Sequence, residues 1–315
     1  MLRWSLYIIS LLVLASCKTN KINISNTARD AGYCYPSMCY KFDTTFIPVK
    51  DIAPILNDKV LTDNYTIHDI TLANAIGMLP ALQKLAHTQN LKSVSNEKKI
   101  AILEEREKIV NRLLIASTAV SSIAAELDCE GERANQLASF MDDKDDKRIK
   151  KLTAFSIILG AAAGVVTNVL QPGNAYYGIG VTGGVISGAL ALVTLSKNKK
   201  AQFYHERNLL AEIWYESDTT CAFPPFVWYI LSDKEFSNDK KYPIRYNIKH
   251  RWEKLGRLGK EGTKKREQQI QLLFGKGGEY SAELLHIRSD MIDQLQSSIR
   301  LLNQDLESLI IAVSH

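Results

Sequence analysis

The sequence predicts a mainly α-helical, elongated protein: a helical bundle of coiled-coil-like helices, a long antiparallel hairpin with an apolar, glycine-rich tip, and a small irregular cap. Three patterns support this prediction. Two segments carry apolar residues at seven-residue spacing, which is typical of helices that pack along one another. Residues 152–170 and 178–196 are two uncharged apolar stretches separated by a polar turn. Residues 218–262 interrupt the helical pattern with adjacent prolines and several aromatic side chains.

The amino terminus has the pattern of an export signal. Arg3 precedes an apolar stretch that is too short to span a bilayer. This stretch ends in the letters LASC at residues 14–17, which resemble the lipobox of bacterial lipoproteins. The resemblance implies that residues 1–16 are removed and that Cys17 becomes an acylated, palmitate-type amino terminus. It also favours the outer membrane, facing the periplasm, because a lysine rather than an aspartate follows the cysteine. The alternative is an ordinary secretory signal cut near Ser16.

The mature chain is long enough to bury one large core or two smaller ones. Its content of 46% hydrophobic and 23% charged residues is ordinary for a globular protein, which argues against wholesale disorder. The predicted organisation is a signal peptide at 1–16, a tether and cysteine-containing segment at 17–65, a helical domain at 66–217, an irregular aromatic and basic cap at 218–262, and C-terminal helices at 263–315.

Before the hairpin, the chain is expected to form short strands and then helices. Short strands are expected at Thr45–Pro48 and Lys59–Leu61, and a helix at about Asp69–Thr88, perturbed at Pro80. A stronger prediction is the helix from Asn96 to Leu127. Its apolar residues recur every seven positions at Ile102, Ile109, Ala116 and Ile123.

The hairpin is expected to stand on two polar stems, Glu132–Lys151 and the returning helix Lys197–Tyr215. Each nineteen-residue arm would rise about 28 Å as a helix, close to the roughly 30 Å of a bilayer's hydrocarbon core. Glycines at four-residue spacing allow close approach of a second backbone. These helix-packing residues are Gly160, Gly164, Gly180, Gly184 and Gly188. The hairpin at 152–196 is therefore expected inside a membrane or an oligomer, with burial in a soluble bundle as the alternative.

After the hairpin, a short helix is expected at Phe226–Leu231, and another at Lys264–Phe274 that ends in a turn at Gly275–Gly278. The last helix, Ser281–Val313, has a heptad pattern. Its apolar positions are Leu285, Ile292, Ile299, Leu306 and Val313. It is expected to pack against the Asn96–Leu127 helix, with a second copy of itself as the alternative.

Four further cysteines remain in the exported chain: Cys34, Cys39, Cys129 and Cys221. An even number outside the cytoplasm indicates disulfides. The hairpin midpoint lies near Asn174, so continuous antiparallel arms would bring Cys129 level with Cys221. Cys34 would then pair with Cys39. Four buried free thiols are the alternative.

A basic run lies between Lys240 and Arg266, a stretch that contains eleven Lys and Arg residues and two Glu residues. Because the chain is exported, anionic lipid headgroups or envelope polymers are expected partners for this run, and nucleic acid is not. The expected contact residues are Lys249, Arg251, Lys254, Arg257, Lys264, Lys265 and Arg266. A solvated basic face is the alternative.

The sequence contains no nucleophile elbow, phosphate-binding loop or zinc-ligand spacing. We therefore expect a non-enzymatic cell-envelope lipoprotein, without cofactor or metal, that anchors or bridges membranes through its lipid and its hairpin. Its expected partners are the membrane and a homo-oligomer or an envelope complex. One alternative is a pore-forming protein, since the architecture resembles the helical pore-forming toxins. Another is an interaction module that docks its hairpin into a partner complex.

Overall fold

The structure is a computed structural model that describes residue 34 and residues 48–92, 95–169, 200–216, 222–254 and 258–314, with backbone only at 155, 156 and 158–169. This part of the chain is mainly helical, as the sequence predicts. In chain order its elements are η1 (Ile55–Asn57), α3 (Lys59–Asn64), α4 (Ile67–Ala75), α5 (Leu79–Asn90), α6 (Asn96–Val169), β1 (Ala201–Tyr204), α8 (Leu209–Tyr215), α9 (Pro225–Ser232), η2 (Lys234–Phe236), α10 (Ile244–Lys254), α11 (Lys264–Phe274), β2 (Gly277–Tyr280) and α12 (Ala282–Ser314).

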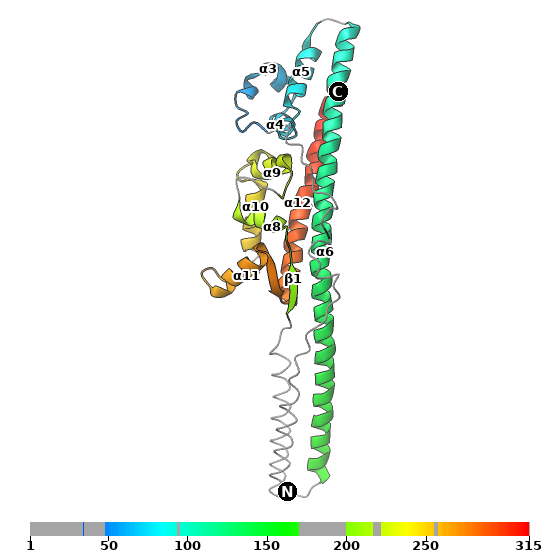
Figure 1. The fold of residues 1–315 in the computed structure, drawn as a ribbon, viewed down its shortest axis with the longest axis vertical. Coiled ribbons are helices and arrows are strands. Elements are labelled where there is room, and N and C mark those ends of the chain that lie inside the picture. Colours follow the sequence, from blue (N-terminus) through cyan, green and yellow to red (C-terminus); the bar gives the residue numbers. More distant parts are fainter. Residues whose placement is uncertain are drawn as a thin grey trace.

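The pair of α6 and α12 is the axis of the molecule, and the smaller elements lie to one side of it (Figure 1). The predicted heptad positions of α12, such as Leu285 and Ile299, are buried against α6. Three hydrogen bonds cross the pair: Ser289 donates to the Gly131 carbonyl, Gln296 donates to the Ala124 carbonyl, and Ser117 donates to Asn303. From one of these contacts to the next, the residue number rises by seven in α12 and falls by seven in α6. The two helices are therefore antiparallel, and the predicted pairing of the last helix with the Asn96–Leu127 segment is confirmed.

The N-terminal helices differ from the sequence prediction in two places. Lys59–Leu61 begins the helix α3 instead of a strand, because the Asp58 carboxylate caps it by accepting from the Val60 and Leu61 amides. The helix expected at Asp69–Thr88 is two helices, α4 and α5. Gly77, with φ of +80°, turns the chain between them, and Pro80 fits the first turn of α5, where no amide donor is needed.

A two-stranded antiparallel ribbon joins distant parts of the chain. Ala201 pairs with Tyr280, and Tyr204 pairs with Gly277. The returning stem predicted as a helix at Lys197–Tyr215 is therefore a strand at Ala201–Tyr204, and it is helical only at α8, Leu209–Tyr215. The turn predicted at Gly275–Gly278 is wrong in its second half, where β2 begins. Gly277 has a φ of +92°, and a Cβ there would lie 2.3 Å from the Phe203 carbonyl oxygen, so the ribbon requires glycine.

The region around the ribbon is more regular than the irregular cap predicted at 218–262, because it contains α9 and α10. The short helix expected at Phe226–Leu231 lies within α9, and the helix expected at Lys264–Phe274 is α11 with the same bounds. Burial explains these helices, since the apolar side chains of α9 and α11 enter the same core as those of α12.

We call the packed part of the molecule, residues 48–141 and 200–314 as far as they are described, the head. The helix α6 continues far beyond it (Figure 1). Met141 is its last buried side chain among those described. We call residues 142–169 the α6 extension, which spans roughly 42 Å at 1.5 Å per residue. The head positions this extension, and the functional question is what the extension and its surroundings can contact.

Candidate functional site

The α6 extension joins a charged stretch to an apolar one on a single helix. Residues 142–151 carry both signs of charge and are mostly exposed. Their ion pair Lys147–Asp143, at 4.0 Å between fully hydrated groups, contributes little to stability. The backbone remains helical from Leu152 to Val169, so this part of the first predicted arm is a helix. Gly160 and Gly164 lie in it, whereas Gly180, Gly184 and Gly188 lie outside the described residues.

Within the described residues, one stretch of α6, Asn96–Ala154, is long and apolar enough to cross a membrane by length and composition. Part of this stretch is buried against α5 and α12, as in the core helices of soluble proteins. Length and hydropathy of α6 alone therefore do not identify a membrane segment.

The observed disulfide joins Cys34 to Cys129, with Cα atoms 5.5 Å apart. The predicted pairing of Cys129 with Cys221 is therefore wrong, and so is the pairing of Cys34 with Cys39. Cys39 and Cys221 lie outside the described residues, as does Cys17.

The reason for this error lies in the returning chain. Arg133 donates to the Tyr204 carbonyl at 2.9 Å, and the Arg207 guanidinium lies 3.2 Å from Glu126. Cys129 is therefore level with the residues between 204 and 207, and not with Cys221. The prediction assumed a return that is helical throughout, whereas residues 201–204 form the strand β1, which advances about 3.3 Å per residue instead of 1.5 Å.

The predicted basic surface is divided between structural and exposed side chains. Lys249 and Arg266 both approach the Trp214 ring, at 5.6 Å and 6.0 Å from its centroid. Lys249 also pairs with Glu216, and Arg266 with Glu253, each at 3.5 Å. These two cations therefore stabilise the head. The remaining predicted side chains that the structure describes are exposed: Arg251 and Lys254 on α10, and Lys264 and Lys265 on α11. Arg257 lies outside the described residues.

An aromatic stack holds α8, α10 and α11 together beneath these cations. The Trp214 and Phe274 rings are stacked with centroids 4.3 Å apart, and Trp252 lies 6.1 Å from Phe274 on the other side. All three side chains are buried. Trp252, which lies within the basic run of the sequence, is therefore part of the core.

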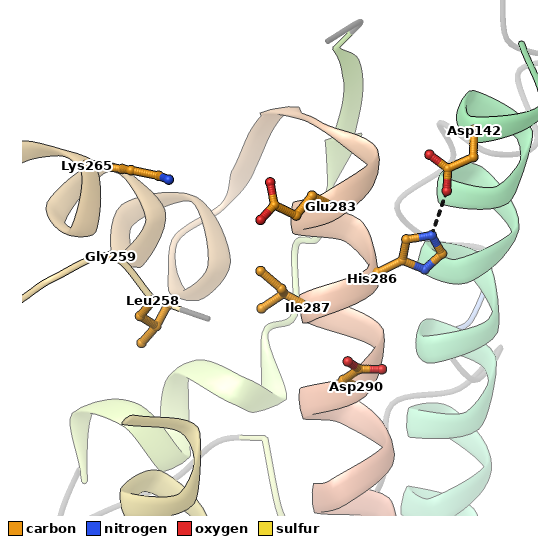
Figure 2. Close-up of a pocket in the computed structure, with 8 residues that line it drawn as sticks. All are labelled: Asp142, Leu258, Gly259, Lys265, Glu283, His286, Ile287 and Asp290. Carbon is orange, nitrogen blue, oxygen red and sulfur yellow. Dashed lines mark hydrogen bonds and ion pairs between the residues drawn. The ribbon is translucent and has the colours of Figure 1, made fainter. Parts of the chain in front are cut away.

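An open pocket of about 850 Å³ lies between α6, α11 and α12 (Figure 2). Its floor includes the buried side chains Leu258 and Ile287. Figure 2 shows Lys265 and Glu283 projecting toward the same space, while His286 points to α6. There the imidazole lies 2.9 Å from the Asp142 carboxylate. Among the described residues no group of three or more His, Cys, Asp or Glu side chains is arranged to bind a metal.

Buried charges lie where α6 meets the ribbon. Arg133 pairs with Glu130 at 2.9 Å, and its guanidinium lies 4.0 Å above the Phe203 ring. Next to them, burial raises the pKa of Glu126 to about 7; the Arg207 charge opposes this shift and the Glu130 charge adds to it. Burial therefore destabilises the ionised form of Glu126 by more than the ion pair with Arg207 stabilises it.

His205 and Tyr280 form a neutral pair beside these charges. The Tyr280 hydroxyl donates to the Leu272 carbonyl at 2.6 Å, so His205 Nε2 donates to that hydroxyl at 3.1 Å. Burial, together with the Arg288 and Arg133 charges, lowers the pKa of His205 to about 2. Burial also raises the pKa of Tyr280 to about 12. Both groups therefore stay uncharged at neutral pH.

The sequence analysis missed this buried cluster, although a signal was present. Glu130 occupies the next seven-residue step after Ile123, and Arg288 lies between the heptad residues Leu285 and Ile292. A charge at an apolar heptad position indicates a buried polar partner. The partners themselves, such as Arg207, come from parts of the chain that no local pattern connects.

No known protein family, curated protein or solved structure matches this chain. Its function therefore has to be argued from its own residues.

Proposed function

We propose that the protein is a non-enzymatic cell-envelope lipoprotein that anchors or bridges membranes through a lipid on Cys17 and the apolar hairpin 152–196. The observation that carries this proposal is the α6 extension. One uninterrupted helix leaves the head, passes through exposed charges at 142–151 and enters an uncharged apolar stretch. A charged collar followed by an uncharged helix suits the border of a bilayer, where backbone groups must be satisfied within the helix.

The lipid part of the proposal rests on the lipobox resemblance at residues 14–17. The same resemblance favours the outer membrane, with the head facing the periplasm. The resemblance implies two acyl chains on Cys17, which together anchor a chain stably, and a further apolar element gives the protein a second attachment to lipid. The hairpin is the second element that we propose.

Fractionation of a Cys17→Ser protein, exported with an ordinary secretory signal, tests the hairpin without the lipid. We expect this protein to remain with the membranes. Adding Ile158→Lys and Leu190→Lys places a charge near the middle of each arm, which costs roughly 2.5–3.5 kcal/mol per residue on insertion scales. We expect this double variant to move to the soluble fraction.

The matched control adds the same two charges to exposed positions of the helices. Ile149 and Leu301 are 43% and 55% exposed, so Ile149→Lys with Leu301→Lys should leave the protein in the membrane fraction. A Cys17→Ser protein that is soluble, with its hairpin protected from protease, would establish the buried-bundle alternative. Labelling of the Cys17→Ser chain by a fatty-acid analogue would contradict the lipid part of the proposal.

A further inference from the structure

One face of α6 is apolar and exposed near its amino-terminal end. Ile100, Leu103, Val110 and Leu114 are 56%, 63%, 45% and 66% exposed. We call these four residues the α6 stripe. Their spacing of three, seven and four positions places them at successive a and d positions of a heptad repeat, along one side of the helix. Single exposed apolar residues are ordinary, but an ordered row of large ones is typical of a contact surface.

The α6 stripe is turned away from the packed side of the helix. The buried residues Ile109, Leu113 and Ala116 point to the head. At 100° per residue, the stripe lies roughly 130° around the axis from them. The helix α5 reaches α6 on the opposite flank, where Lys84 bonds Glu105 at 2.7 Å. The labelled helices and strands in Figure 1 also lie on one side of α6. Within the part of the chain that the structure describes, the stripe is therefore uncovered.

The charges beside the stripe identify a second copy of the same helix as its partner. With Ile100 at an a position, Lys99 takes the preceding g position and Glu104 the next e position, and both side chains are exposed. In a parallel coiled coil a g residue faces the e residue five positions later in the partner. Lys99 of one copy would then face Glu104 of the other, twice by symmetry. An antiparallel pair in which Leu103 meets Leu114 would place Lys99 opposite Thr118 and Glu104 opposite Leu113, so this pairing of opposite charges would be absent.

One residue in the row is polar. Glu107 occupies the a position between Leu103 and Val110 and is exposed in the single chain. In the parallel pair the two Glu107 carboxylates would meet in one layer, and the repulsion between their like charges lowers the stability of the pair. The pairing should therefore be weak in solution and stronger on a membrane, where confinement raises the effective concentration.

We propose that two copies of the chain associate in parallel through the α6 stripe. Both α6 extensions then point in the same direction. If the hairpins enter lipid, as proposed above, a dimer inserts both of them into one membrane. This last step rests on the proposed function, whereas the association itself does not.

Oxidative cross-linking of the full-length chain in detergent tests the orientation. A Leu103→Cys variant should form a covalent dimer, because equal positions meet in a parallel pair. Ile115→Cys is the matched control, since Ile115 is 56% exposed on the same helix but lies off the stripe. Mixing size-tagged Leu103→Cys with untagged Leu114→Cys tests the antiparallel register. Cross-linking only between the two variants would overturn the parallel arrangement.

Sedimentation of the same chain tests the energetics. Leu114→Lys should weaken the dimer at least about tenfold, and Glu107→Leu should tighten it at least about tenfold, because burial of apolar area changes in opposite directions. Ile115→Lys should change nothing. Lys99→Glu should weaken association, and adding Glu104→Lys should restore it.

A chain that stays monomeric at every concentration, even with Glu107→Leu, would overturn the proposal. That result would leave the membrane fractionation of the lysine variants unchanged, so the failure of the dimer and the failure of the membrane proposal are distinguishable.

Discussion

At the scale of single residues, Glu126 is a buried acidic side chain of α6. Its side chain is 2% exposed, and Arg207 is its ion-pair partner. Neither carboxylate oxygen has a hydrogen bond to a described residue. A carboxyl whose pKa is raised by folding binds its proton more tightly in the folded chain. Its contribution to stability is therefore full below its ordinary pKa of 4.5 and is lost as the pH rises to about 7.

We predict that Glu126→Gln removes part of the pH dependence of stability. Between pH 4.5 and pH 8 the free energy of unfolding of the parent chain should fall by on the order of 3 kcal/mol more than that of the variant. Urea unfolding in detergent at the two pH values measures this difference. Glu132→Gln is the control, because Glu132 lies on the same helix and is exposed. Equal pH dependence in the parent and Glu126→Gln would show that Glu126 ionises normally.

At the scale of elements, the ribbon depends on one residue without a side chain. The strand β2 approaches β1 so closely at Gly277 that a Cβ would lie 2.3 Å from a backbone oxygen. No side-chain movement can relieve this clash, because the atom that a Cβ would meet belongs to the backbone of Phe203. The ribbon joins β1, which follows the proposed hairpin in the chain, to β2, which precedes α12. This close approach therefore holds the returning chain against the head.

We predict that Gly277→Ala destabilises the head by about 3 kcal/mol or more, because it adds a steric clash to an unfavourable backbone conformation. Gly262→Ala separates the two effects. Gly262 also has a positive φ, +73°, but nothing lies within 4 Å of its Cβ position. This control should lose only about 1–2 kcal/mol. Thermal unfolding of both variants compares them, and equal losses would mean that the two strands can separate without cost.

The same elements show which parts of the fold can be predicted from the sequence. The helices α11 and α12 and the pairing of α12 with α6 follow from local spacing of apolar residues, which a single chain displays. The ribbon, the disulfide and the pair Glu126–Arg207 depend on how far the chain advances between distant residues. The prediction of the cysteine pairing assumed a helical return, whereas Ala201–Tyr204 is a strand and Cys129 pairs with Cys34.

At the scale of the whole molecule, the disulfide joins the amino-terminal segment to the middle of α6. Cys34 and Cys129 are 95 residues apart, and the loop between them contains α3, α4, α5 and the first part of α6. Closing such a loop restricts the unfolded chain much more than the folded one.

We predict that mass spectrometry of an unreduced digest shows a linked Cys34–Cys129 peptide. In the chain-entropy model, Cys34→Ser should destabilise the protein by about 4–5 kcal/mol. Cys39→Ser provides the comparison and should leave this linked peptide unchanged. Recovery of a Cys129–Cys221 peptide instead would contradict the structure.

The contact between Arg133 and the Tyr204 carbonyl affects which insertions and deletions the protein can accept. The helix α6 leaves the head after Met141, and the chain is back beside α6 at Tyr204, so the segment between them starts and ends on the head. If residues 152–196 form the proposed hairpin, the length of this segment sets how far the tip of the hairpin lies from the head. Insertions or deletions made equally in its outgoing and returning halves would change this distance by about 1.5 Å per helical residue. The head would keep its own contacts, and the segment would act as a spacer of variable length.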